Sequence, residues 1–278
     1  MSLVHSDGMA EVYSADCLDG PAMVEIMAGR LADALIFDAP YSTKTHAGHS
    51  SGKLTADRAS AFGARQRAAG RDSAEIRYAA RSGAKGHDRN DLDYASFDPD
   101  KIAAFCAVWL PLCSGWVVSI TDDVLAPAWA AEFERAGLYA FQPLPLVEIG
   151  SRVRMSGDGP SAWSCWIVAA RPRGKVFAKW GTLPGAYIQP ADLRGEGRDG
   201  RIVGGKPLRS MCGLVRDYSR RGGLVVDPFA GAGTTLLAAK QWGRLSIGVE
   251  CSPERAALCG RRLDRTHEQF DLFEGVAL

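Results

Sequence analysis

The chain has 278 residues, 46% of them hydrophobic and 23% charged, which indicates a globular protein with a sizeable core. Its seven cysteines are scattered and never spaced C-x2-C, so the sequence predicts neither a disulfide framework nor a zinc site. No apolar run approaches the roughly 18 residues that a membrane span needs and no basic leader is present, so we expect a cytoplasmic protein.

The net charge of +1 conceals an uneven distribution of charge along the chain. Residues 44–89 and 151–209, called here the two basic windows, together hold 21 Lys and Arg against eight Asp and Glu, a surplus of 13. The remainder holds 12 Lys and Arg against 24 Asp and Glu. This segregation indicates a polyanion-binding face on an acidic body, and the alternative is a pair of solvated basic loops.

Short apolar runs rich in Val, Ile and Leu alternate with helical patterns, which favours an α/β sheet buried on both faces. Seven strands are predicted at 11–14, 34–37, 115–120, part of 139–148, 164–170, 224–226 and 246–249. Helices are predicted at 21–32, 99–112, 125–136, 206–221, 234–242 and 253–267. The last helix has Ser252 as its N-cap and Pro253 at its first position.

The strand at 34–37 ends abruptly in a group of unlike side chains. Asp38, Ala39, Pro40 and Tyr41 follow it in the stretch LIFDAPYSTKTH. A carboxylate, a proline and an aromatic ring therefore stand together where a buried strand ends, which marks this turn as a candidate site.

Two stretches, 42–98 and 171–205, resist the alternating pattern. The first is long and rich in Gly, Ser, Ala and Arg, and the second is punctuated by glycine and proline. Loops of such length in compact domains are usually functional or disordered. Both coincide with the basic windows.

A second candidate site lies in the stretch GGLVVDPFAGAGTTLLAAK, residues 222–240. The strand at 224–226 ends in Asp227, and a turn containing Gly231 and Gly233 opens the next helix at Thr234. Glycines allow a backbone to approach a ligand closely, and parallel sheets bind nucleosides at the carboxyl ends of their strands.

Three kinds of ligand compete for this glycine turn. A phosphate-binding P-loop requires Lys before its Ser or Thr, whereas Gly233 is followed directly by Thr234 and Thr235. A dinucleotide site requires a small residue where the chain has Leu236. The third ligand is a nucleoside without a pyrophosphate, its ribose diol gripped by Glu250 at the end of the following strand. A simple strand-end acid is the alternative for Glu250.

The motifs DPFAGAGTT and DAPY, together with the strand-end Glu250, resemble the S-adenosylmethionine site and the catalytic motif of the amino-group DNA methyltransferases. The order of the motifs, catalytic first and cofactor last with a basic region between them, is similar to the circularly permuted β class of that family. The segments YSADCLDG and KPLRSMCGLV also resemble family segments, so the resemblance covers nearly the whole chain.

The resemblance implies a single methyltransferase domain, 1–278, with an α/β fold: a seven-strand Rossmann-like sheet, mostly parallel with one antiparallel strand. It also implies S-adenosylmethionine as cofactor, DNA as partner, no metal, and a bacterial or phage-infected bacterial cell. Residues 42–98 become a basic loop insertion after the catalytic motif, and 171–205 a candidate target-recognition element. His46 and His49, an H-x-x-H pair in the first loop, are expected to contact DNA or to be plain polar residues.

The resemblance also assigns roles to single residues. Asp16 would face the adenine of the cofactor, and Lys206 its carboxylate end. The other cofactor-binding residues that it implies are Asp227, Pro228, Phe229, Gly231, Gly233, Thr234, Thr235 and Glu250.

Methyl transfer to an exocyclic amine would explain the catalytic turn, Asp38 to Tyr41. The lone pair of such an amine is delocalised into the base, so the nitrogen must be hydrogen bonded and held in line with the methyl group. Asp38 would accept one N–H and the carbonyl of Ala39 or Pro40 the other, while Tyr41 stacks on a base flipped from the duplex. Aspartate in the first position favours adenine N6, and cytosine N4 is the alternative. Ala39 stands where the family usually has a second proline, which loosens the backbone.

Other functions stay open at this point. A turn of this kind also serves methylation of RNA or of a protein amide, and Ala39 makes a DNA-binding relative without turnover conceivable. Separately, the stretch QFDLF from Gln269 to Phe273 resembles the peptide by which bacterial replication proteins dock on the sliding clamp. The alternative for this stretch is a helix end folded onto the core.

Overall fold

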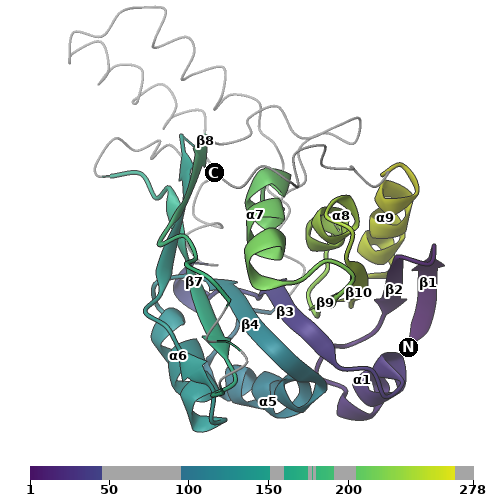
Figure 1. The fold of residues 1–278 in the computed structure, drawn as a ribbon, viewed down its shortest axis with the longest axis horizontal. Coiled ribbons are helices and arrows are strands. Elements are labelled where there is room, and N and C mark those ends of the chain that lie inside the picture. The colour runs from purple at the N-terminus through teal and green to yellow at the C-terminus, as the bar shows by residue number, and fades with distance from the viewer. Residues whose placement is uncertain (46–94, 151–159, 175–176, 178–179, 191–204, 267–278) are drawn as a thin grey trace, which may run out of the picture.

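The computed structural model describes residues 1–45, 95–150, 160–174, 177, 180–190 and 205–266, which form one ten-stranded sheet with helices on both faces (Figure 1). The strands are β1 (Ser2–Ser6), β2 (Ala10–Ser14), β3 (Ala32–Asp38), β4 (Cys113–Thr121), β5 (Tyr139–Ala140), β6 (Leu144–Ile149), β7 (Ser164–Arg171), β8 (Tyr187–Pro190), β9 (Leu224–Asp227) and β10 (Leu245–Glu250). The helices are α1 (Gly20–Met27), α5 (Pro99–Trp109), α6 (Ala126–Arg135), α7 (Leu208–Tyr218), α8 (Thr234–Gln241) and α9 (Pro253–Asp264), with a 3-10 turn at η1 (Leu110–Leu112).

The strand order of the sheet is β1-β2-β10-β9-β3-β4-β7-β6-β8, with β5 paired to β7. Within the run β2-β10-β9-β3-β4, every pair of neighbouring strands is parallel. Strand β7 is antiparallel to both β4 and β6. The seven strands from β2 to β6 therefore form a mostly parallel sheet with one antiparallel strand, which confirms the predicted fold class.

Three strands extend this seven-strand sheet beyond the prediction. Strand β1 pairs antiparallel with β2 at one edge, and β8 pairs parallel with β6 at the other. The predicted strand at 139–148 divides into β5 and β6. Strand β1 is largely exposed, and β8 is only four residues long and ends in Pro190, so neither carries the apolar run of a buried strand. Strand β8 also lies within 171–205, which was predicted to be loop throughout.

Helix positions agree with the predictions more closely than helix ends do. Asp19, Asp98 and Ser252 cap α1, α5 and α9 through their side chains, and a proline lies in the first turn of each. Helix α1 ends at Met27 and not at residue 32, because Ala28 adopts a left-handed conformation with φ of 48°.

Alternate residues of the central strand β3 face the two helix layers. Leu35 and Phe37 pack with residues of α1, α5 and α6, whereas Ala34 and Ile36 pack with residues of α7 and α8 (Figure 1). All four side chains are fully buried. Burial of each Leu, Ile or Phe side chain stabilises the fold by about 1.5–3 kcal/mol, so the carboxyl end of β3 is firmly fixed.

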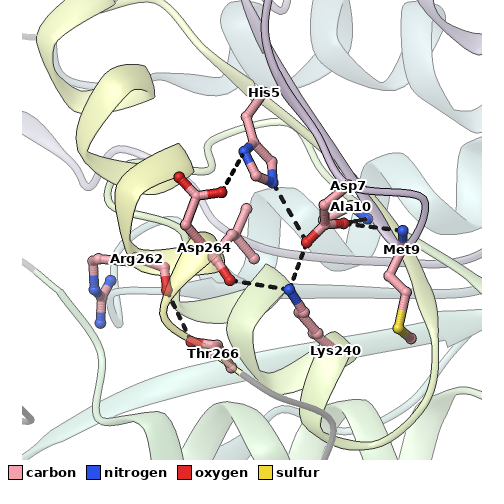
Figure 2. Close-up of polar contacts among 9 residues, drawn as sticks. His5, Asp7, Met9, Ala10, Lys240, Arg262, Asp264 and Thr266 are labelled. Atoms are coloured by element: carbon pink, nitrogen blue, oxygen red, sulfur yellow. Dashed lines mark hydrogen bonds and ion pairs between the residues drawn. The ribbon is translucent and has the colours of Figure 1, made fainter.

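A polar cluster ties the β1–β2 hairpin to α8 and α9 (Figure 2). Lys240 of α8 donates to Asp7 at 2.5 Å and to the carbonyl of Leu263 at 3.0 Å, and His5 lies 3.5 Å from both Asp7 and Asp264. Burial raises the pKa of Asp7, but hydrogen bonds from Lys240 and from backbone N–H groups lower it, to about 2. These contacts fix the β1–β2 hairpin against α8 and α9, while main-chain pairing holds β2 beside β10.

Candidate active site

Four neighbouring parallel strands end in acidic residues at one edge of the sheet. Asp38, Asp227 and Glu250 are the last residues of β3, β9 and β10, and Asp16 follows β2 by two residues. The register pairs Glu250 with Ser14, and Ala15 N–H donates to the Glu250 carbonyl at 3.1 Å. The fold therefore brings the two sequence motifs, 189 residues apart, to the same edge, with Asp16 and Glu250 beside each other.

Glu250 closes the glycine turn from the neighbouring strand. Its carboxylate accepts hydrogen bonds from the N–H of Gly231 at 2.8 Å and from that of Ser252 at 2.9 Å. The residue is only 6% exposed. Glu250 is therefore more than a simple strand-end acid, because it links the glycine turn to the start of α9.

The two glycines of the turn are required for different reasons. Gly233 has φ of 82°, and a Cβ there would lie 2.3 Å from the Sγ of Cys259 in α9. Gly231 has φ of 52°, and the described atom nearest to a Cβ there is the carbonyl oxygen of Phe229, at 3.9 Å. Gly233 therefore lets α9 pack against the turn, whereas Gly231 leaves space beside it.

Asp227 stabilises the glycine turn through hydrogen bonds. Its carboxylate accepts from the Thr235 hydroxyl at 2.5 Å and from the Phe229 N–H at 2.9 Å. Burial raises the pKa of Asp227 to about 7, against the lowering effect of both hydrogen bonds. Asp227 and Thr235 are each 3% exposed, so they shape the turn from inside the protein.

The remaining predicted cofactor residues differ in exposure. Pro228 is buried, and the ring of Phe229 packs against Phe37, Phe97 and Phe105 with centroids 5.4–5.9 Å apart. Thr234, the first residue of α8, is half-buried, and Asp16 is exposed. Contact of these residues with a cofactor stays a prediction.

The side chain of Lys206 contacts the catalytic turn. Its ammonium is 2.5 Å from Oδ2 of Asp38 and 5.0 Å from the centroid of the Tyr41 ring. Oδ1 of Asp38 is buried and has no hydrogen-bond partner among the described residues. Burial lowers the pKa of Lys206, but the Asp38 carboxylate raises it, and the net shift is upward. The resemblance implied a place for Lys206 at the carboxylate end of the cofactor, and the sequence did not predict this ion pair.

Ala39 fills the position of the family's second proline with a buried side chain. It is 2% exposed and belongs to the same core as Phe37 and Phe97. The residues after it are also fixed, because Phe97 N–H donates to the Tyr41 carbonyl at 3.0 Å. Packing and this hydrogen bond therefore restrain a backbone that the missing proline was expected to loosen.

Asp122, just beyond the end of β4, anchors the chain that leaves the catalytic turn. It accepts from the N–H and hydroxyl of Ser42 at 2.9 and 2.5 Å, from the Thr45 hydroxyl at 2.6 Å and from Leu125 N–H at 3.0 Å. Burial raises its pKa, but these hydrogen bonds lower it, and the net shift is downward. Sequence reasoning missed Asp122. The signal was available, because the residue follows the predicted strand at 115–120 by two positions, much as Asp38 follows its own strand.

Several predicted features lie outside the described residues. They include His46, His49, the stretch from Gln269 to Phe273, and most of both basic windows. Within the described part of the chain, no group of three or more His, Cys, Asp and Glu residues could hold a metal ion. No helix in that part is long and apolar enough to cross a membrane.

Comparison with known proteins shows a local and a global similarity. Residues 189–259 match the family model described as DNA methylase. The type II methyltransferase M.HindIII of Haemophilus influenzae is 49% identical over 51 residues, which cover 18% of this chain and 16% of that protein. The matched segments span a fifth or less of the length of the curated relatives that they match. The segment that matches the family model contains the glycine turn, Glu250 and Lys206.

The global similarity is to solved structures. The M1.HpyAVI–SAM complex superposes with a TM-score of 0.60 at 17% identity, covering 92% of this chain and 100% of that one. The PvuII DNA methyltransferase, which is cytosine-N4-specific, superposes with a TM-score of 0.57 at 12% identity, covering 94% of this chain and 88% of that one. The Rossmann-like methyltransferase fold and the resemblance to S-adenosylmethionine-dependent DNA methyltransferases are confirmed. The permuted β-class order stays a prediction.

Proposed function

We propose that this chain transfers a methyl group from S-adenosylmethionine to the exocyclic N6 of adenine in DNA. The observation that carries the proposal is the position of the two turns. The glycine turn after β9 and the catalytic turn after β3 leave adjacent parallel strands at the same edge of the sheet. A nucleoside cofactor at the first turn and a flipped base at the second would therefore meet.

The glycine turn fits an S-adenosyl nucleoside. Gly231 leaves space beside the backbone, and Glu250 stands at the strand end where an acid can accept from the ribose diol. Oε2 accepts one backbone N–H, from Gly231, and keeps a further lone pair for the diol, whereas Oε1 accepts from the Ser252 N–H and from the Cys251 thiol. Asp16, two residues after the strand that pairs with β10, would face the adenine, as the resemblance implies. When bound, the cofactor supplies an electrophilic methyl group on a sulfonium ion.

The catalytic turn supplies acceptors for the target amine. Oδ1 of Asp38 has no hydrogen-bond partner in the part of the chain that the structure describes, and it would accept one N–H of the amine. The carbonyl of Ala39 or Pro40 would accept the other, which aims the nitrogen lone pair at the methyl group. The nitrogen would exchange one proton for the methyl group that the cofactor supplies, and Oδ1 of Asp38, which would accept an N–H of the amine, would be the first acceptor of that proton. Tyr41 would stack on the flipped base.

The choice of adenine rests on the resemblance, since Asp38 occupies the first position of the catalytic motif. Cytosine N4 is the second candidate, because one solved structure of similar fold is a cytosine-N4-specific enzyme. RNA, a protein amide, or DNA binding without turnover are further alternatives.

Both basic windows are proposed to hold DNA phosphates, with a subset of their side chains reading bases. The sliding-clamp contact of the stretch from Gln269 to Phe273 stays a prediction from its sequence. A pull-down of purified clamp with the wild-type chain and with Leu272→Ala/Phe273→Ala tests it, and equal binding by both would contradict it.

The test of the proposed function is transfer of radiolabelled methyl groups from S-adenosylmethionine to duplex DNA, with single-stranded RNA as the comparison. Asp38→Ala should abolish transfer and leave the calorimetric Kd for the cofactor roughly unchanged, because the carboxylate acts on the amine. A thermal melt checks that the variant is folded. Near-normal turnover by Asp38→Ala, or transfer to RNA alone, would contradict the proposal.

A further inference from the structure

The ion pair between Lys206 and Asp38 joins positions 168 residues apart in the chain. Lys206 is two residues before α7, and Asp38 is the last residue of β3. The two side chains are 13% and 25% exposed, so the pair is largely withdrawn from water. Electrostatic contacts are stronger in such surroundings than at the surface, and leaving one partner unpaired is costly.

The ion pair places the two carboxylate oxygens of Asp38 in different surroundings. Oδ2 of Asp38 contacts the ammonium at 2.5 Å, whereas Oδ1 is buried without a partner among the described residues. A carboxylate on a single side-chain bond can rotate, but one held at Oδ2 presents Oδ1 in a fixed direction. A buried acceptor without a partner is unfavourable, and an amine N–H would satisfy it.

The same ammonium lies 5.0 Å from the centroid of the Tyr41 ring, within the range of a cation–π contact. Lys206 therefore touches the first and the last residue of the catalytic turn. We infer that Lys206 is a positioning residue, which acts through Asp38 and Tyr41 to hold the catalytic turn in the geometry that accepts the target amine. This inference rests on the proposed function and replaces the assignment of Lys206 to the carboxylate end of the cofactor.

Two variants of Lys206 test the inference. Lys206→Met keeps the length of the apolar stem and removes the charge, and Lys206→Arg restores a cation. Methionine should lower kcat by about 10- to 100-fold, the loss that a misplacement of about 1 Å causes. The calorimetric Kd for S-adenosylmethionine should stay within about twofold, since the residue does not hold the cofactor. Arginine should recover part of kcat.

The matched control is Arg261→Met, which also replaces a positively charged side chain by methionine, but at an exposed position on α9. It should leave kcat and Kd unchanged. A Lys206→Met variant with unchanged kcat, or with a Kd weakened about tenfold and kcat restored at saturating cofactor, would overturn the inference.

A double-mutant cycle covers the case in which Lys206→Met does not fold. Asp38→Asn/Lys206→Gln removes both charges and leaves neither one buried alone. Because Lys206 acts through Asp38, the Lys206→Gln change should lower residual kcat much less in the Asp38→Asn background than in the wild type. Equal losses in the two backgrounds would overturn the inference. A wild-type protein without any methyl transfer would instead contradict the proposed function itself.

Discussion

Asp38 and Asp227 end adjacent strands, yet their surroundings differ. Asp38 faces the ammonium of Lys206, whereas Asp227 is enclosed and hydrogen bonded to Thr235 and to a backbone N–H. Burial raises the pKa of Asp227 to about 7. Asp38 therefore lies in an ion pair, whereas Asp227 is a buried structural acid that carries its proton below about pH 7.

The raised pKa of Asp227 predicts a specific pH dependence of stability. Between the ordinary pKa near 4 and about 7, the folded state binds a proton that the unfolded state has lost. This contribution is therefore fully present below pH 4, falls as pH rises to about 7, and is constant above that.

Asp227→Asn should remove this dependence. The test is the free energy of unfolding in urea at pH 5 and pH 8, for the wild type and for Asp227→Asn. We expect the wild type to lose more stability between the two values than the variant does. An identical difference in both proteins would show that Asp227 does not titrate in this range.

Sequence patterns identified the residues of the catalytic turn and the glycine turn, because both follow apolar runs directly. They did not identify the partners that orient them. Lys206 and Asp122 reach the catalytic turn from distant segments, and only the fold brings these segments together. Asp122 was detectable in principle as another strand-end acid, whereas no spacing rule pairs Lys206 with Asp38.

At the scale of elements, Asp122 at the end of β4 binds the segment that follows β3 and the catalytic turn. Asp122 accepts two hydrogen bonds from Ser42 and one from Thr45, and all three groups lie just after the catalytic turn. Asp122→Ala should therefore lower the free energy of unfolding by about 1–3 kcal/mol and lower kcat about tenfold or more, since buried donors lose their acceptor and the turn shifts. Urea unfolding and the methyl-transfer assay measure these effects.

The neighbouring Asp123 provides the control. Its side chain is 67% exposed and lies 3.8 Å from Lys44 at the surface. Asp123→Ala should change both quantities little, because exposed ion pairs contribute little to stability. Equal effects of the two substitutions would contradict the anchoring role of Asp122.

The glycine turn predicts different outcomes for its two glycines. Gly233→Ala places a Cβ 2.3 Å from the Sγ of Cys259 and should destabilise the protein markedly, with partial recovery in Gly233→Ala/Cys259→Ala. Gly231→Val faces no such clash with α9 and should mainly weaken calorimetric binding of S-adenosylmethionine, although its positive φ adds some strain. A strongly unfolded Gly231→Val, or a stable Gly233→Ala, would contradict this division.

The sequence predicted the positions of those helices and strands whose apolar residues are buried in the core. All six helices of the described residues overlap a predicted helix, and the central strands were found from their apolar runs. The edge strands β1 and β8 were missed, because main-chain pairing and not an apolar pattern defines them. The early end of α1 depends on the left-handed conformation of Ala28, which alanine rarely adopts.

At the scale of the whole molecule, the two basic windows give a surplus of 13 positive charges to a chain of net charge +1. If these side chains neutralise phosphates, the affinity for DNA should fall steeply with salt, because bound counterions are released. Five phosphate contacts correspond to a slope of about −4.5 in a plot of log K against log salt. Fluorescence anisotropy over a range of salt concentrations measures the slope, and a value near zero would mean that the windows do not contact phosphate.

The central claim is that the catalytic turn at the end of β3 directs methyl transfer to an exocyclic amine of DNA. Modification-sensitive sequencing of DNA from cells that express the wild-type chain, compared with cells that express Asp38→Ala, tests it most directly. We predict N6-methyladenine at a recurrent short sequence in the first DNA and its absence in the second. Unmodified DNA in both, or the same modification in both, would contradict the claim.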